Sequence, residues 1–297
     1  MLTSIRGLTA ATLFAGTAFI ATPALAADDI AVEGDFLNVE AATAEAVAAD
    51  APAADVALDT GAITLTRVAQ PIEAEVASQM GGESGLEISG NVALVSDYRF
   101  RGVSFSDGDF ALQGGIDVAH SSGFYVGTWA SSISGGSPYG ELELDVYGGW
   151  SGDISEGISF DIGLLYYIYP TGDTPGFDSD YFEPYASISG DLGPVNATLG
   201  VAYAWDQASL GSQDNFYIYT DFETAIPNTP ISLTAHLGYT DGVFATKASG
   251  KSFDWGVGAS WAITDSLSLG VNYVDTEGPS FEDFTDAGFF FTLGYSM

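Results

Sequence analysis

Acidic side chains that alternate with apolar ones are the part of this sequence best suited to chemistry. Glu141, Glu143 and Asp145 are separated by leucines, so that every second residue carries a carboxylate. Successive side chains of a β-strand point to opposite faces, and this spacing therefore places the three carboxylates on one face. Rows of Asp and Glu attract cations in the pores of cation channels. The spacing thus predicts a strand with a cation-attracting face.

The same alternation places charged and polar side chains on one face of several other predicted strands. No carboxylate falls in the middle of a predicted strand on the apolar face. We therefore expect the polar faces to line a common interior. The predicted interior residues are Arg99, Arg101, Asp117, Glu141, Glu143, Asp145, Asp161, Asp221, Glu223, His236 and Asp254.

Two arginines stand among these carboxylates, in a long predicted loop over residues 98–108. Arg99 and Arg101 follow Asp97 closely in the chain. If the loop folds toward the mouth of the interior, the arginines oppose the carboxylates and create a transverse field. The alternative is an arginine–carboxylate network that fills the space, and it is favoured because small barrels fill their interiors with side chains.

The remaining polar motifs predict no catalytic, cofactor or metal site. His236 could belong to a Ser-His-Asp hydrolase such as an outer-membrane phospholipase, but serines are so frequent that a nearby one has little meaning. The acidic residues between Asp173 and Glu183 lack the spacing of an EF-hand loop. The absence of cysteine excludes disulfides and thiolate zinc sites. We predict a protein without enzymatic activity.

The charge balance restricts the partners of the chain. In 297 residues there are 40 Asp and Glu but 6 Lys and Arg, which gives a net charge of −34. Such a surface repels phosphate backbones, and nucleic-acid binding is therefore excluded. Aromatic residues make up 13% of the chain, a content that excludes disorder throughout.

Three segments follow one another along the chain. Residues 1–26 combine the basic Arg6, an apolar stretch and a small-residue cleavage site, which is typical of a signal peptide. Residues 27–85 are acidic and rich in alanine. They predict a flexible periplasmic extension because they hold too little apolar surface to fold, and a plug is the alternative. Residues 86–297 contain all five tryptophans and all 15 tyrosines and predict the folded domain.

This folded segment alternates apolar and polar side chains almost throughout, as half-buried β-strands do. Connections after odd strands are long and those after even strands are short, as in outer-membrane barrels. An even number of strands closes the sheet and leaves no edge, which lipid requires. We predict an all-β fold, a transmembrane antiparallel up-and-down β-barrel of about 12 strands, or of ten if the third and sixth are not formed. The predicted strands are 86–94, 110–118, 124–131, 142–150, 158–164, 181–189, 195–203, 216–223, 231–239, 253–261, 267–273 and 289–297.

Proline and aromatic residues mark the ends of some predicted strands. Pro184 removes a ladder donor from the sixth strand, and we expect that strand to begin after it. The aromatic residues close to strand ends are Trp150, Tyr166, Tyr167, Tyr169, Tyr203, Trp205, Phe253, Tyr273 and Tyr295. Aromatic residues at such positions form girdles at the two membrane interfaces, and we expect these residues to do so.

The beginning of the folded segment carries a family resemblance. The matching runs are VSDYRFRGVS at 95–104, LQGG at 112–115, GFYVGTW at 123–129 and ELDVYGG at 143–149. They resemble the TorF family of proteobacterial porins, of the Gcw_chp type, over about residues 88–297, with 27–85 outside the resemblance. The resemblance implies an outer-membrane barrel with a pore. One departure is the terminal Met297, where outer-membrane proteins usually carry the phenylalanine that the barrel-assembly machinery recognises.

Together these observations predict a porin-like channel in the bacterial outer membrane, through which small hydrophilic, cationic solutes diffuse passively without a cofactor. One alternative is a structural or adhesive barrel with a closed lumen, whose surface loops bind the partner. The other is a lipid-active hydrolase that uses His236. The expected partners are outer-membrane lipids, lipopolysaccharide, the barrel-assembly machinery and small hydrophilic solutes. The sequence does not determine the oligomeric state.

Overall fold

A computed structural model of the chain describes residues 85–172, 176 and 178–297. The expected signal peptide 1–26 lies outside the described residues, as does nearly all of the expected extension 27–85. None of the helices in the described part is long and apolar enough to span a membrane.

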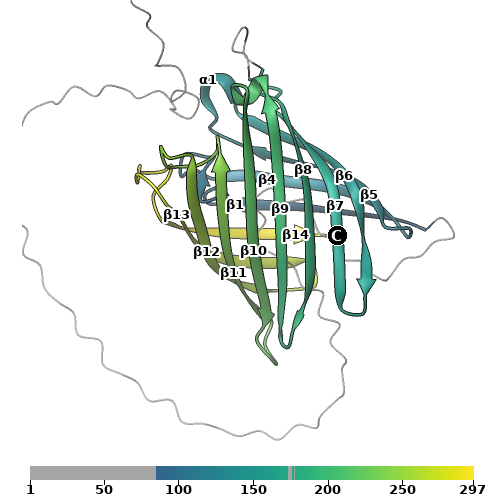
Figure 1. Cartoon of the computed structure of the whole chain (residues 1–297). Coiled ribbons are helices and arrows are strands. Elements are labelled where there is room, and N and C mark those ends of the chain that lie inside the picture. Colours follow the sequence, from purple (N-terminus) through teal and green to yellow (C-terminus); the bar gives the residue numbers. More distant parts are fainter. Residues whose placement is uncertain (1–84, 173–175, 177) are drawn as a thin grey trace, which may run out of the picture. The chain divides into compact units, whose positions relative to one another are not determined.

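Twelve antiparallel strands in the described part form one closed barrel (Figure 1). Each strand pairs with its neighbours along the chain, and the first strand closes the sheet by pairing with the last. The prediction of 12 strands is therefore confirmed, and the ten-stranded alternative is wrong because both doubtful strands are formed. The barrel strands are β1 (Leu86–Val95), β4 (Ala111–His120), β5 (Phe124–Ser132), β6 (Leu142–Ser155), β7 (Ile158–Ile168), β8 (Tyr181–Leu192), β9 (Val195–Gln207), β10 (Gln213–Ala225), β11 (Ile231–Gly242), β12 (Lys251–Ala262), β13 (Leu267–Thr276) and β14 (Gly288–Ser296).

The alternation of side chains sorts the two faces of this wall. Leu199 and Val257 lie on the outside and keep more than half of their surface exposed. Tyr217 and Asn215 belong to the opposite phase of β10, and both are buried in the interior. A shift of one residue in the pairing would exchange the two faces, and the apolar pattern therefore specifies the register.

Pro184 lies inside β8, and the expectation that this strand begins after the proline is wrong. The strand begins at Tyr181, and Pro184 pairs with Leu164 of β7. The ladder from β8 to β9 starts only at the next residue, Tyr185. Nearer the start of β8, the side-chain amide of Gln207 takes the place of the missing ladder bonds. It accepts a hydrogen bond from the N–H of Phe182 at 2.9 Å and donates one to the C=O of Phe182 at 2.8 Å. The proline thus lies at the end of a ladder, where a missing donor is tolerated.

A small hairpin between β1 and β4 enters the barrel. Its strands are β2 (Arg99–Phe100) and β3 (Val103–Ser104), and all four residues are buried. Arg101 and Gly102 form the turn with φ values of +49° and +80°. Positive φ at both central residues is the geometry of the two-residue hairpin turn that matches strand twist. Gly102 is required for a second reason, because a Cβ there would overlap the backbone of Asp275.

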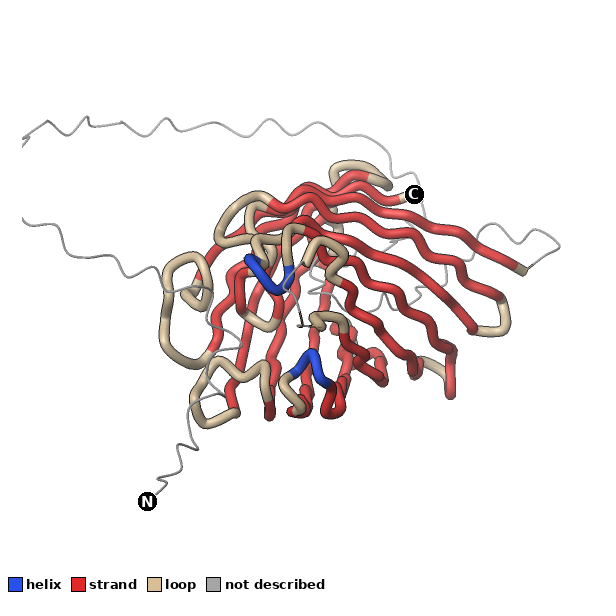
Figure 2. The backbone as a smooth tube through the Cα atoms, turned by 90° about the horizontal axis from the view of Figure 1, so that it is seen from above, coloured by secondary structure: helices blue, strands red, loops and turns tan. Residues whose placement is uncertain are grey.

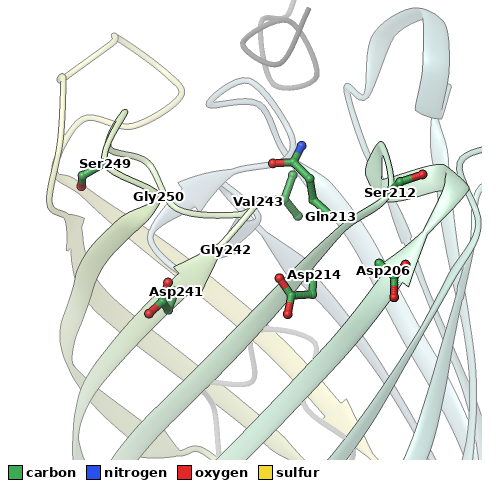
Figure 3. A pocket seen from close by; sticks show the side chains of 9 residues that line it. All are labelled: Asp206, Ser212, Gln213, Asp214, Asp241, Gly242, Val243, Ser249 and Gly250. Atoms are coloured by element: carbon green, nitrogen blue, oxygen red, sulfur yellow. The ribbon is translucent and has the colours of Figure 1, made fainter.

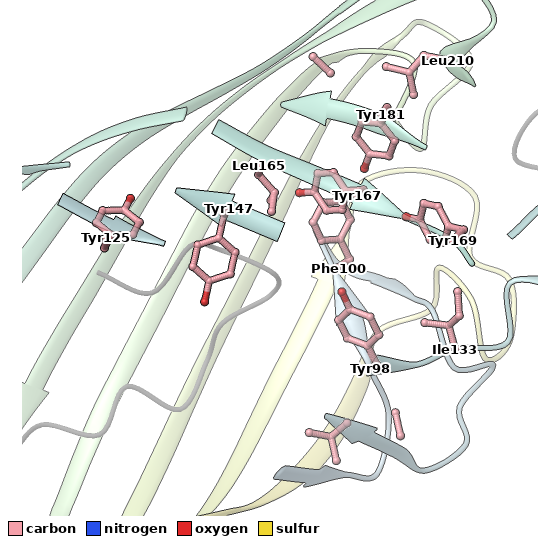
Figure 4. Packing of buried hydrophobic residues seen from close by; sticks show 13 residues of the cluster. Tyr98, Phe100, Tyr125, Ile133, Tyr147, Leu165, Tyr167, Tyr169, Tyr181 and Leu210 are labelled. Atoms are coloured by element: carbon pink, nitrogen blue, oxygen red, sulfur yellow. The ribbon is translucent and has the colours of Figure 1, made fainter. Parts of the chain in front are cut away.

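Aromatic side chains hold this hairpin against the inner wall. Phe100 lies beside Tyr167, with ring centroids 6.2 Å apart, and Tyr167 stacks on Tyr181 at 4.4 Å (Figure 4). Tyr98 makes edge contacts with Phe105 and Trp129, both at 5.5 Å. The core of this barrel is therefore inside the wall, where rings fill the space between the hairpin and the strands.

Glycines on neighbouring strands make room for the interior tyrosines. A Cβ at Gly200 would overlap the ring of Tyr219, and one at Gly238 would overlap the hydroxyl of Tyr217. These tyrosines therefore lie flat over the adjacent strand rather than across the lumen. Two short helices, α1 (Gly136–Tyr139) and η1 (Ala208–Leu210), lie among the long connections (Figure 2).

Candidate functional site in the barrel interior

The base of the inward hairpin is fixed by Arg99 and Asp97. The guanidinium of Arg99 forms a salt bridge with Asp97 and donates to the backbone carbonyl of Asp286 at 2.7 Å. Asp97 also accepts hydrogen bonds from the hydroxyls of Ser104 at 2.5 Å and Ser106 at 3.2 Å. These contacts within the segment and to the β13–β14 connection keep the hairpin in the interior.

Arg101 projects from the tip of the hairpin and pairs with β8. Its Nη2 donates to both carboxylate oxygens of Glu183 at 3.0 and 2.9 Å, and both side chains are buried. The guanidinium carbon lies 4.0 Å from the ring centroid of Tyr217, 4.7 Å from Phe100 and 5.8 Å from Phe244. Burial disfavours the charge, but Glu183 more than offsets this and raises the pKa of Arg101 above its usual value. Arg101 is thus a buried cation that is surrounded by one carboxylate and three aromatic rings.

Glu143 and Asp145 lie near this ion pair on β6. Glu143 is fully buried and accepts hydrogen bonds from the hydroxyls of Tyr98 at 2.8 Å and Tyr169 at 3.2 Å. Burial raises the pKa of the Tyr98 hydroxyl, and the charge of Glu143 raises it further, so that Tyr98 remains a donor. Asp145 is 2% exposed, and within the described residues its Oδ1 has no hydrogen-bond partner.

A second layer of tyrosines and carboxylates lies further along the barrel. Tyr125 donates to Asp161 at 2.7 Å, and Tyr147 donates to Asp117 at 2.5 Å. The hydroxyl of Tyr185 is hydrogen-bonded to that of Tyr125. The predicted interior carboxylates Asp117 and Asp161 therefore face the lumen and accept hydrogen bonds from phenol groups.

His236 on β11 is bonded on both ring nitrogens. Its Nδ1 contacts Asp221 at 2.5 Å, and its Nε2 contacts Asp254 and the hydroxyl of Tyr217, each at 2.9 Å. A Ser-His-Asp hydrolase needs a serine hydroxyl on the nitrogen that here faces Tyr217 and Asp254. In the described part of the chain, the ring bonds of His236 go only to these three residues. The geometry of a catalytic triad is not formed at His236.

Two further predicted interior residues, Glu141 and Glu223, differ from each other in their environment. Glu141 precedes β6 in a turn at the rim and is exposed, while its backbone N–H donates to the hydroxyl of Thr171 at 2.8 Å. The alternation rule failed for Glu141 because the strand begins only at the following residue. Glu223 keeps the polar phase of β10, where it is half-buried and pairs in register with Thr234.

Tyrosines are the interior residues that the sequence-based prediction did not include. Tyr167 and Tyr169 were expected in an interfacial girdle, but both are buried inside the barrel. The signal that predicts their position is the alternation itself. Tyr167 and Tyr169 lie an even number of positions after Asp161, and their side chains therefore point to the same inner face as Asp161. Tyr166 and Trp205 do lie on the outer wall, where each stacks on Phe182.

Two cavities open at the rim formed by the long connections. One of about 490 Å³ is lined by Asp206, Asp214 and Asp241 and by the turn at Gly250 (Figure 3). Lys251 pairs with Asp241 at 2.8 Å, and Tyr203 donates to Asp214 at 3.0 Å. The other, of about 780 Å³, includes Glu141 and Thr171. Among the described residues, no group of three or more His, Asp or Glu has the arrangement to hold a metal ion.

The family described as "Bacterial protein of unknown function (Gcw_chp)" matches residues 79–295 of this chain. The chain belongs to the Gcw_chp family. The match begins seven residues before the barrel domain predicted at 86, so that it includes the end of the expected extension. The narrower TorF label rests only on the sequence resemblance. Among curated proteins, none matches this Gcw_chp chain.

Solved structures with a similar architecture include two porins and one outer membrane channel. The NanC porin is 11% identical, with a TM-score of 0.49, over 71% of this chain and 99% of its own. The KdgM porin, solved with disordered oligogalacturonate, is 9% identical, with a TM-score of 0.46, over 70% and 96%. An outer membrane channel from Pseudomonas putida F1 is 14% identical, with a TM-score of 0.42, over 74% and 97%. At these values the similarities do not identify what the Gcw_chp barrel conducts or binds.

Proposed function

We propose that this Gcw_chp protein spans the bacterial outer membrane as a narrow channel for small hydrophilic cations. The observation that carries the proposal is the division of the wall into an apolar outer face and a carboxylate-rich interior. Charged interiors select ions of the opposite sign. Asp117, Glu143, Asp145 and Asp161 contribute to an interior in which carboxylates outnumber the arginines of the hairpin.

The outer face supports the location in a membrane. Large apolar side chains on every barrel strand are exposed there, far beyond the patches that a soluble protein leaves uncovered. Aromatic pairs lie on this face toward the rim with the long connections, for example Tyr239 with Phe253 and Tyr273 with Phe289, at 4.9 and 5.1 Å. Amphipathic rings at this height suit the headgroup region. We expect lipids, including lipopolysaccharide, to cover this band.

Placing a charge on this face should destabilise the barrel only if lipid covers it. Val257 lies in the middle of β12 and is 58% exposed. Val257→Arg is expected to lower the unfolding free energy in phospholipid vesicles by about 2–4 kcal/mol. Urea titration followed by tryptophan fluorescence measures this value. Ala248→Arg, in an exposed connection, is the control and should change it little. Equal effects of the two variants would contradict the location in a membrane.

The inward hairpin supports a narrow channel rather than a wide pore. Arg101 and Glu183 are almost completely buried, whereas the Asp221 carboxylate further along the lumen is 44% exposed. We infer that water enters the interior from the end with the short turns and that the hairpin forms the constriction. The bonds of Arg99 to Asp97 and of Arg101 to Glu183 support the arginine–carboxylate network, and a transverse field across an open mouth stays a prediction.

Reversal potentials in planar bilayers test the proposed channel. The refolded full-length mature protein is inserted between unequal KCl solutions, and we expect small single-channel steps with K⁺ preferred over Cl⁻. Preference for Cl⁻ would contradict the role of the interior carboxylates. Complete absence of conductance would favour the structural or adhesive barrel instead, which the buried Arg101–Glu183 pair also supports.

A further inference from the structure

Three buried carboxylates lie on neighbouring parts of the wall, and one of them, Glu183, binds the guanidinium of Arg101. Glu143 and Asp145 are on β6 and Glu183 is on β8, and we call these three residues the acidic cradle. Each is no more than 2% exposed. Asp145 pairs in register with Tyr167 of β7, and Tyr167 donates to Glu183 at 3.0 Å, which links the two parts of the cradle. Glu143 and Asp145 are two residues apart on β6, and their side chains therefore point to the same face.

The cation in this cradle belongs to a loop and not to the wall. Arg101 is at the tip of the hairpin, and only its Nη2 is hydrogen-bonded. Within the described residues its Nε and Nη1 have no hydrogen-bond partner, although both are buried. Buried donors without a partner carry a desolvation penalty that a better-fitting occupant avoids. The hairpin is anchored separately through Arg99, so that Arg101 can leave Glu183 while the base of the hairpin stays in place.

The cradle has capacity for more positive charge than Arg101 supplies. The Oδ1 atom of Asp145 has no hydrogen-bond partner in the described part and is buried beside two further carboxylates. A buried carboxylate without a partner is costly, and protein sites usually provide such a group with a cation or a donor. Tyr217 and Phe244 add aromatic faces, which attract guanidinium and ammonium groups.

We propose that the acidic cradle, with the rings of Tyr217 and Phe244, is a binding site for small solutes that carry a guanidinium group. Arg101 occupies this site as a tethered substitute, and an entering solute displaces it from Glu183. The site rests on the proposed channel function for its access route. The guanidinium of Arg101 lies between the carboxylate of Glu183 and the ring of Tyr217, and this arrangement indicates guanidinium compounds as the class of solute.

Competition between Arg101 and free methylguanidinium tests the site. Arg101→Ala removes the tethered guanidinium and leaves its space, whereas Arg101→Ala/Glu183→Gln also removes the carboxylate that binds it. Block of the K⁺ current by methylguanidinium is measured in planar bilayers for the wild type and both variants. The half-blocking concentration should fall by about tenfold or more in Arg101→Ala, because the site is no longer occupied by the protein itself. Block should be lost in the double variant.

A surface variant controls for the change in net charge. Lys247 pairs with Glu277 at 2.7 Å in an exposed connection, and Lys247→Gln removes one positive charge without touching the cradle. The half-blocking concentration of methylguanidinium for Lys247→Gln should equal that of the wild type. If Lys247→Gln and Arg101→Ala gain sensitivity equally, the effect is one of overall charge and the site is contradicted.

Calorimetric titration in detergent separates this site from the channel function. Methylguanidinium is titrated into refolded Arg101→Ala and into the double variant, whose folding is checked by the heat-dependent shift in gel mobility. If methylguanidinium releases heat on binding to Arg101→Ala but not to the double variant, the site is supported even when no variant conducts. The absence of conductance then contradicts only the proposed channel function. Conductance without block in Arg101→Ala, together with no heat of binding, overturns the inference.

Discussion

Glu183→Gln is expected to lower the free energy of unfolding by about 3–5 kcal/mol, since it leaves a buried guanidinium without its counterion. Arg101 is almost completely buried, and Glu183 is its one hydrogen-bonding partner among the described residues. Urea titration in phospholipid vesicles, followed by tryptophan fluorescence, measures the loss.

The double variant and a surface pair separate this effect from a general loss of charge. Arg101→Met/Glu183→Gln removes both charges and keeps a side chain over Tyr217, and it should recover most of the stability. Asp241→Asn breaks the exposed pair with Lys251 and should cost no more than about 1 kcal/mol. A double variant that is no more stable than Glu183→Gln alone would contradict a counterion effect.

Removal of the inward hairpin is expected to raise the single-channel conductance several-fold. Residues 99–104 fill the lumen at the level of the acidic cradle, and their replacement by a glycine–serine linker widens the narrowest section. The current should stay cation-selective, because Glu143 and Asp145 remain on the wall while the positive charges of Arg99 and Arg101 are removed. Bilayer recordings of both proteins under the same KCl gradient measure conductance and selectivity together.

A second connection serves as the control for loop replacement. Residues 247–250 lie at the rim, and their replacement by the same linker should leave the conductance unchanged. Gel mobility with and without heating shows whether each variant forms the barrel. An unchanged conductance in a folded hairpin variant would mean that the constriction lies elsewhere in the lumen.

The alternation of the sequence predicted most of the barrel because it is a local property. Side chains that are two residues apart identify the two faces of each strand. The lengths of the connections indicate which strand ends lie at the same rim of the barrel. The interior positions of Asp145, Asp161 and Asp254 follow from this rule alone. The rule fails where a strand has not yet begun, as at Glu141. The separate expectation that β8 begins after Pro184 fails because the proline lies at the end of a ladder, where a missing donor is tolerated.

The tyrosines show a different limit of sequence reasoning. Tyr167 has the composition of a girdle residue and the phase of an interior one, and the structure follows the phase. Its position is stabilised by Phe100, which approaches from the hairpin far away in the chain. Aromatic residues suit both a membrane interface and a packed lumen, and residue type alone therefore cannot distinguish the two.

The sequence by itself determined that this chain forms a closed, carboxylate-lined barrel with an apolar exterior, since period-two alternation specifies both faces of every strand. Tertiary structure alone decided which carboxylates have a cation. The pairing of Arg101 with Glu183 joins residues that are 82 positions apart and depends on how one hairpin folds into the lumen. Loop conformation follows from contacts across the barrel, and no local pattern encodes those contacts.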